Sequence, residues 1–273
     1  MLEPTTLHLA WQRVRANRGG PGGDAVTLAQ FERRLDEEIA TLRRSIVTGR
    51  YRPGPLRRIA VPKSDGGERI LAIPCVRDRV VQTALLLVLQ PLVEQRQSHA
   101  SFGYRPARGV AEALDAVRRA HAAGLSWTLE ADIVQYFASV PHHRLLGELA
   151  IWIEAEDVLC LLAQWLAGFS DGGVGIAQGA PISPLLANLY LHPMDRLLVA
   201  AGYVPVRYAD DFVVLARGAH AVEQAWRMTE GILAERGLGL KDRKTRIVAP
   251  GVAFTFLGQT LCAPVLSHIP RLI

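Results

Sequence analysis

Hydrophobic positions recur along the chain with two periods, one typical of helices and one typical of strands. Apolar residues at helical spacing predict helices over residues 7–16, 28–47, 77–94, 110–122, 142–150, 156–167, 184–198 and 219–236. Short apolar runs predict strands over residues 57–61, 69–73 and 127–133, two within 203–216, and others over 245–248 and 253–257. We expect Pro91 to kink or end its helix. From these patterns we expect an α/β or α+β protein with a mixed sheet.

Glycine-rich segments separate some of these elements. Residues 17–24 read N-R-G-G-P-G-G-D and lie between two predicted helices. Because no strand precedes them and no G-K-[ST] follows, they are a poor match to a phosphate-binding loop. Asp65-Gly66-Gly67, between the first two predicted strands, is typical of a hairpin turn.

Two adjacent carboxylates interrupt the apolar stretch V-R-Y-A-D-D-F-V-V-L-A at residues 206–216. An ionised carboxylate in apolar surroundings is costly unless it is protonated, paired or bound to a metal ion. Asp210 and Asp211 lie at the predicted bend between two strands, and Asp132 ends another strand. Convergence of the three would form a site for two Mg²⁺ ions and for nucleotidyl transfer. The alternative for the two adjacent aspartates alone is an exposed type I′ hairpin turn.

Composition indicates a folded chain of 273 residues, with 49% hydrophobic and 21% charged residues. The longest apolar run, residues 84–89, is too short to cross a bilayer, and no basic and then apolar leader opens the sequence. We therefore expect a cytoplasmic location. Cys75, Cys160 and Cys262 lie far apart, so we expect three buried thiols rather than a zinc site or a disulfide framework.

Charge is distributed unevenly. Residues 1–100 contain 16 Lys and Arg against 10 Asp and Glu, whereas residues 101–273 contain 15 against 16. The basic first part is the candidate surface for a polyanion, and the alternative is a solvated charged face. Six arginines of this part fall within sixteen residues: Arg43, Arg44, Arg50, Arg52, Arg57 and Arg58.

Several motifs resemble the conserved boxes of reverse transcriptases. Y-A-D-D at residues 208–211 resembles their catalytic box, and A-D-I-V-Q-Y-F-A-S-V-P-H-H at 131–143 resembles their first carboxylate box. Q-G-A-P-I-S-P-L-L-A-N-L-Y-L at 178–191 resembles the box that positions template and nucleotide, and residues 238–248 and 254–258 resemble the last two boxes. V-P-K-S-D-G-G-E-R-I-L-A-I-P at 61–74, continuing to residue 82, and N-R-G-G-P-G-G-D-A-V-T at 17–27 resemble group II intron-type enzymes in particular. Their shared order is what makes the resemblance specific.

The resemblance implies an α+β right-hand polymerase with fingers and a palm built on an antiparallel sheet flanked by helices. Residues 1–125 would be mainly fingers, and residues 126–258 mainly palm with fingers elements interleaved around 142–177. Residues 259–273 would be a tail where a thumb normally begins, and we expect the thumb to be absent.

The resemblance also implies a metal centre. Asp132 and Asp210 would be the main ligands of two Mg²⁺ ions, with Mn²⁺ as an alternative. Asp211 would be a supporting carboxylate, and the backbone carbonyl of Ile133 a further metal contact.

Residues around the substrate follow from the same resemblance. Phe137 would lie under the sugar and exclude a ribonucleotide, although a lone phenylalanine is more often a core aromatic. Lys63 and Arg69 would grip the triphosphate, and Gln178 and Gly179 would touch nucleotide and template, or else form a loop that caps the next helix. Two further roles complete the set: Lys244 as proton donor to pyrophosphate, and Phe256, Leu257 and Gly258 as primer grip, which without the family would be only an apolar strand.

The implied function is an RNA-directed DNA polymerase that extends a DNA or RNA primer with dNTPs on an RNA template. The alternative is a nucleic-acid-binding subunit or domain without a thumb, which needs a protein partner or fused domain in order to polymerise. Group II-like reverse transcriptases also occur, without an intron, beside CRISPR spacer-acquisition proteins. The sequence resembles that branch and the intron branch equally. An RNA-dependent RNA polymerase is disfavoured by Phe137 and by Ala209 before the aspartates.

Overall fold

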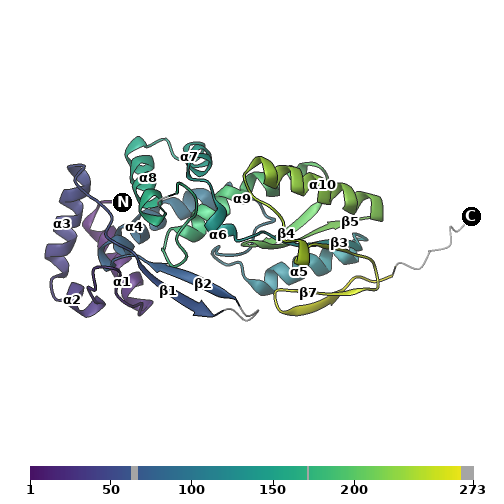
Figure 1. Ribbon diagram of the computed structural model, residues 1–273, viewed down its shortest axis with the longest axis horizontal. Helices are drawn as coiled ribbons and strands as arrows, with labels where there is room; N and C mark the ends of the chain where they lie inside the picture. The colour runs from purple at the N-terminus through teal and green to yellow at the C-terminus, as the bar shows by residue number, and fades with distance from the viewer. Residues whose placement is uncertain (63–66, 171, 266–273) are drawn as a thin grey trace, which may run out of the picture. The chain divides into compact units, whose positions relative to one another are not determined.

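The computed structural model describes residues 1–62, 67–170 and 172–265 (Figure 1). Its helices are α1 (Pro4–Ala16), α2 (Leu28–Glu32), α3 (Leu35–Val47), α4 (Val76–Glu94), α5 (Val110–Ala122), α6 (Tyr136–Ser139), α7 (His142–Ala150), α8 (Glu156–Phe169), α9 (Ser183–Ala200) and α10 (Ala219–Glu235). Its strands are β1 (Arg57–Pro62), β2 (Glu68–Ile73), β3 (Trp127–Asp132), β4 (Val204–Tyr208), β5 (Asp211–Ala216), β6 (Arg246–Val248), β7 (Ala253–Phe256) and β8 (Gln259–Cys262). A short 3₁₀ helix, η1, spans Asp242–Lys244. These elements confirm the expectation of an α+β fold.

The chain folds into two compact units. Unit 1 contains residues 1–96 and 140–187, and unit 2 contains residues 97–139 and the chain from Asn188 onward. The assignment of residues 1–125 to fingers, 126–258 to palm and 259–273 to a tail stays a prediction.

Unit 1 is built from helices and one antiparallel hairpin, β1–β2, in which Arg57 pairs with Ile73. Helix α1 packs on α4 through a buried face. The prediction of one helix over residues 28–47 is wrong, because the backbone leaves helical geometry at Arg34, with φ −125° and ψ 29°, and forms α2 and α3 instead. Pro91 lies inside α4, which continues to Glu94 before it ends.

Unit 2 contains a four-stranded sheet in the order β4-β5-β3-β6. Every neighbouring pair in this sheet is antiparallel, so the expectation of a mixed sheet is wrong. For β4 and β5 the reason is local, because a two-residue connection joins them and reverses the chain. The antiparallel pairing of β3 with β5 and β6 joins strands that are far apart in the sequence. Helix α10 covers one face of the sheet and α5 the other (Figure 1). The face toward α5 forms a core with Leu114, Val117, Val213 and Leu215.

The hairpin β7–β8 packs on the same core through Phe254, Phe256 and Leu261. Leu257 and Gly258 form its two-residue turn, with φ of 50° and 76°. Positive φ at both positions is the signature of a type I′ turn, whose twist matches that of the two strands.

Two expectations drawn from composition have different outcomes. Cys75 is buried as predicted, but Cys160 and Cys262 are exposed, so the expectation of three buried thiols is wrong. Cys160 faces away from the apolar side of the amphipathic helix α8. No helix within the described ranges is long and apolar enough to cross a membrane.

Candidate active site

Two strands of unit 2 bring the predicted carboxylates together at one end of the sheet. Asp132 is the last residue of β3 and Asp211 the first of β5, and the antiparallel register places them directly opposite each other. Ala209 and Asp210 form the connection from Tyr208 to Asp211. Of these two residues Ala209 alone has positive φ, 61°, so the turn is not the type I′ alternative. The three aspartates therefore lie at the same end of the sheet, where β3 ends and β5 begins.

This arrangement is electrostatically unfavourable for the protein alone. The pKa of Asp211 is raised to about 7, mainly by burial and next by the negative charges of Asp132 and Asp210, while the charge of Lys244 opposes the shift. Like charges directly opposite each other on neighbouring strands destabilise a sheet. The edge is therefore a place where a cation would be stabilised.

Two lysines place positive charge next to these carboxylates. Lys244 Nζ lies 2.9 Å and Lys241 Nζ 3.4 Å from Oδ2 of Asp132. The Lys241 N–H donates to the Asp132 carbonyl at 2.8 Å, and the 3₁₀ helix η1, which follows directly, ends at Lys244. Lys241 was not singled out in the sequence, although it lies in the same motif as Lys244.

The Ile133 carbonyl is the backbone group predicted to contact metal. Ile133 and Leu240 form an isolated antiparallel bridge, whose bonds run from the Val134 N–H to the Gly239 carbonyl and from the Lys241 N–H to the Asp132 carbonyl. Neither bond uses the Ile133 carbonyl. Across the described parts of the chain, no group of three or more His, Cys, Asp or Glu side chains is arranged to hold a metal ion.

Phe137 lies beside Tyr136 in α6, a helix of a single turn. The two rings meet edge to face with centroids 5.7 Å apart. Phe137 is 9% exposed, so most of the ring is packed against protein. Its role against a sugar stays a prediction.

Other predicted substrate contacts lie in unit 1. Arg69 is exposed on β2, and Lys63 lies outside the described residues. The Gln178 carbonyl accepts a bond of 2.6 Å from the Ala72 N–H, and Gly179 has a φ of 111° next to the Ala72 carbonyl. These contacts hold the 178–179 loop to β2. The Gln178 Oε1 atom is buried and has no hydrogen-bond partner among the residues that the structure describes.

The predicted primer grip occupies the end of the β7–β8 hairpin. The Phe256 side chain is only 1% exposed and belongs to the core, while Leu257 is half-buried and Gly258 is exposed. A primer could therefore meet Leu257 and the Gly258 backbone more readily than the Phe256 ring.

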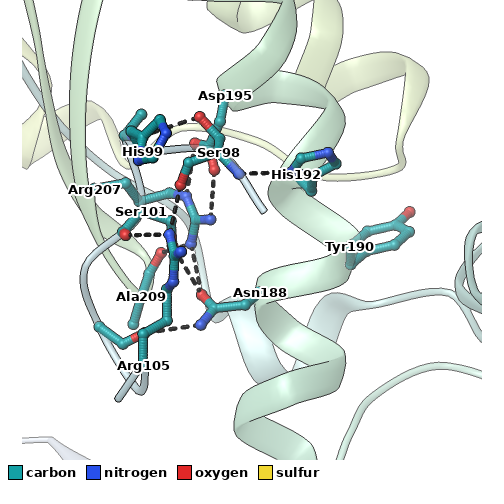
Figure 2. Close-up of polar contacts among 12 residues, drawn as sticks. Ser98, His99, Ser101, Arg105, Asn188, Tyr190, His192, Asp195, Arg207 and Ala209 are labelled. Atoms are coloured by element: carbon teal, nitrogen blue, oxygen red, sulfur yellow. Dashed lines mark hydrogen bonds and ion pairs between the residues drawn. The ribbon is translucent and has the colours of Figure 1, made fainter. Parts of the chain in front are cut away.

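A buried polar cluster beside the Y-A-D-D turn was missed in the sequence (Figure 2). Arg207, immediately before Tyr208, is fully buried and forms a two-bonded ion pair with Asp195, at 2.8 and 2.6 Å. Asn188, His192 and Asp195 of α9 are also buried and follow one another at helical spacing. The sequence did contain a signal for this cluster: a row of polar residues in an otherwise apolar helix, and an arginine in an otherwise apolar strand.

Comparison with known proteins places this geometry in context. A family model described as reverse transcriptase (RNA-dependent DNA polymerase) matches residues 61–261. Protein YkfC of Escherichia coli K12 is 33% identical over 95% of this chain and 81% of its own length. The group II intron-encoded protein LtrA of Lactococcus lactis is 30% identical over 73% of this chain, which spans only 34% of LtrA. A chain in the structure titled partial Cas6-RT-Cas1–Cas2 complex matches with a TM-score of 0.50 and 25% identity, over 85% of this chain and 41% of that one.

Proposed function

Because the chain belongs to the reverse transcriptase (RNA-dependent DNA polymerase) family, we propose that it is an RNA-directed DNA polymerase that adds dNTPs to a primer 3′ end. The observation that carries the proposal is the pairing of Asp132 with Asp211 across β3 and β5, with Asp210 in the adjoining turn. A chain that only bound nucleic acid would have no physical use for three carboxylates at one sheet edge, because they repel phosphates.

The donor set suits Mg²⁺, a hard cation that favours carboxylate and carbonyl oxygens. Asp132 and Asp210 would hold the ions, supported by Asp211 and the Ile133 carbonyl. Mg²⁺ is commonly bound through one or two carboxylates together with substrate phosphates, so a complete cage of protein ligands is not required. When bound, two such ions supply activation of the attacking hydroxyl and charge stabilisation of the leaving group.

The chain's own residues would orient the substrates and move one proton. The Lys244 ammonium, held 2.9 Å from Asp132 Oδ2, lies at the carboxylate edge and would donate a proton to pyrophosphate. Phe137 would exclude the 2′-hydroxyl of a ribonucleotide by packing against the sugar. Lys63 and Arg69 would bind the triphosphate, Gln178 and Gly179 the nucleotide and template, and Leu257 with Gly258 the primer end.

Primer extension tests the proposal directly. The purified chain would receive a labelled DNA primer on an RNA template, dNTPs and Mg²⁺, beside its Asp210→Asn variant. Asp115→Asn is the matched control, since Asp115 is an exposed aspartate of unit 2 that pairs with Arg118 on the surface of α5. We expect extension by the wild type and by Asp115→Asn, and a loss of at least about 100-fold in Asp210→Asn. Equal extension by wild type and Asp210→Asn would refute the assignment of the metal ligands.

A second candidate is a nucleic-acid-binding subunit or domain of a larger assembly, which needs a partner to polymerise. It is favoured by the similarity to a chain of a Cas6-RT-Cas1–Cas2 complex, of which this chain spans 41%. Binding of the primed template without extension, at matched salt concentration, would support this candidate over the first.

A further inference from the structure

We propose that Arg207 is a positioning residue for the catalytic turn: its guanidinium, fixed by Asp195 and Asn188, holds the Ala209 carbonyl and so the peptide from which Asp210 projects. The inference rests on the proposed polymerase function and adds to it a set of residues outside the predicted site. It concerns unit 2 alone, where all the contacts that carry it lie.

The guanidinium makes bonds in two directions. Its Nε and Nη2 atoms donate to the two carboxylate oxygens of Asp195, and both side chains are 0% exposed. Its Nη1 atom donates to the Ala209 carbonyl and to Asn188 Oδ1, at 3.0 Å each. A planar arginine fork with fixed partners on one edge defines the position of whatever its remaining N–H groups bind. Here that group is the backbone of the turn.

The held peptide is conformationally unfavourable. Ala209 has a φ of 61°, in the left-handed region that residues other than glycine rarely enter because the backbone is strained there. Such backbone persists where its surroundings impose it, and the bond from Arg207 to the Ala209 carbonyl is a specific restraint of that kind. Asp210 is the next residue, so a change in the Ala209 peptide would redirect the carboxylate.

A second element packs against the turn from the segment 98–105. The N–H of Phe102 donates to the Arg207 carbonyl and the N–H of Arg207 donates to the Ala100 carbonyl, at 2.8 Å each. A Cβ on Gly103 would lie 2.8 Å from the Ala209 nitrogen, so the two backbones touch. Asn188 Nδ2 donates to the Gly103 carbonyl at 2.7 Å, and its Oδ1 accepts from Arg207. Asn188 therefore ties this segment and the guanidinium to α9 (Figure 2).

The simpler reading is a core ion pair that only stabilises unit 2. A pair with that role alone would be replaceable by apolar side chains of similar volume, because such replacements are often neutral or stabilising for the fold. A positioning role makes a different prediction: the fold would survive the replacement, and the catalytic turn would lose its restraint. The two readings are therefore separated by comparing stability with turn geometry and turnover.

The test uses the full chain with two variants and one control. Arg207→Lys keeps a positive charge but loses the fork, and the double variant Arg207→Met/Asp195→Leu removes the ion pair without leaving a buried charge. Val222→Ala, at a fully buried position of α10, destabilises unit 2 through a residue that is not part of the cluster. Each protein is assayed for thermal unfolding, for kcat and KM of a dNTP in primer extension, and for amide hydrogen exchange in residues 208–212.

Both Arg207 variants should have a kcat about 10- to 100-fold lower at temperatures at which they are folded. KM should change less, because the misplaced group is the Asp210 carboxylate at the reacting atoms rather than a group that binds the dNTP. Exchange at residues 208–212 should accelerate in both, whereas Val222→Ala should unfold at a lower temperature with kcat and exchange at the turn unchanged. A folded double variant with wild-type kcat and wild-type exchange would overturn the proposal. If the wild type fails to extend primers, the proposed function fails, and the exchange comparison still decides the role of Arg207. If the double variant does not fold, Arg207→Lys decides by the same two measurements.

Discussion

Each unit buries an aspartate, and the two are stabilised in different ways. Asp195 of unit 2 faces the guanidinium of Arg207, with both side chains fully buried. Asp78 of unit 1 accepts from the Tyr51 hydroxyl at 2.7 Å and from the Gly54 N–H at 2.8 Å, and its nearest cation, Arg77, is 3.5 Å away and partly exposed. One site is a charge pair and the other is mainly a set of neutral donors.

Electrostatics follow from this difference. Burial raises the pKa of Asp78 despite the opposing effects of the hydrogen bonds from Tyr51 and Gly54 and of the Arg77 charge. Burial alone would lower the pKa of Arg207, but Asp195 outweighs it and the pKa of Arg207 is raised. The buried charge pair therefore lies next to the Y-A-D-D turn, whereas the buried carboxyl that joins segment 51–54 to α4 is held mainly by neutral donors.

The largest expected effect comes from breaking the charge pair on one side. Arg207→Ala leaves Asp195 buried without its counter-charge, and we expect the free energy of unfolding to fall by about 3–5 kcal/mol. Urea denaturation followed by circular dichroism measures this loss. Arg207→Met/Asp195→Leu should be clearly more stable than Arg207→Ala, and equal instability of the two would contradict the charge-pair account.

A smaller effect is expected from Tyr51→Phe in unit 1. The Tyr51 hydroxyl donates to Asp78 and accepts from Trp165 Nε1 at 3.0 Å, so its removal leaves two buried polar groups without this partner. We expect a loss of about 1–3 kcal/mol in the free energy of unfolding. Tyr203→Phe is the matched control, because Tyr203 is half-buried and its hydroxyl forms no hydrogen bond found among the described residues. Equal losses in both variants would show that the Tyr51 cluster adds little.

The smallest effect is a pH dependence at Asp78. Because its pKa is raised in the folded state, its contribution to stability is fully present below the unfolded pKa and is lost as pH rises through the folded pKa. The stability of the wild type relative to Asp78→Asn should therefore fall as pH rises above about 4, the ordinary pKa of an aspartate. Urea denaturation at several pH values measures the difference. An advantage that grows with pH would mean that Asp78 is stabilised as an ion, as in a charge pair.

Local patterns in the sequence were sufficient for much of the fold. The strand over residues 127–133, whose end carries Asp132, and the bend at residues 209–211 were predicted because alternation and turn residues act over a few positions, and the structure ends β3 at Asp132 and begins β5 at Asp211. Pattern reasoning was wrong for residues 28–47, where no glycine or proline marks the break between α2 and α3. It was also wrong for Cys160 and Cys262, since the exposure of a small side chain depends on which neighbours cover it.

The sequence by itself determined the order of the motifs, the type of most elements, and the carboxylates at the end of one strand and in the bend between two others. Only the tertiary structure decided which distant groups meet them: Lys244 reaches Asp132 across 112 positions, and Asn188 reaches Gly103 across 85. Periodicity reports the face on which a residue lies, whereas such contacts depend on how elements far apart in the chain pack together. Arg207 is the clearest case. The sequence alone places it in an apolar strand, but its contacts are with helix α9 and the segment 98–105, which the strand pattern does not specify.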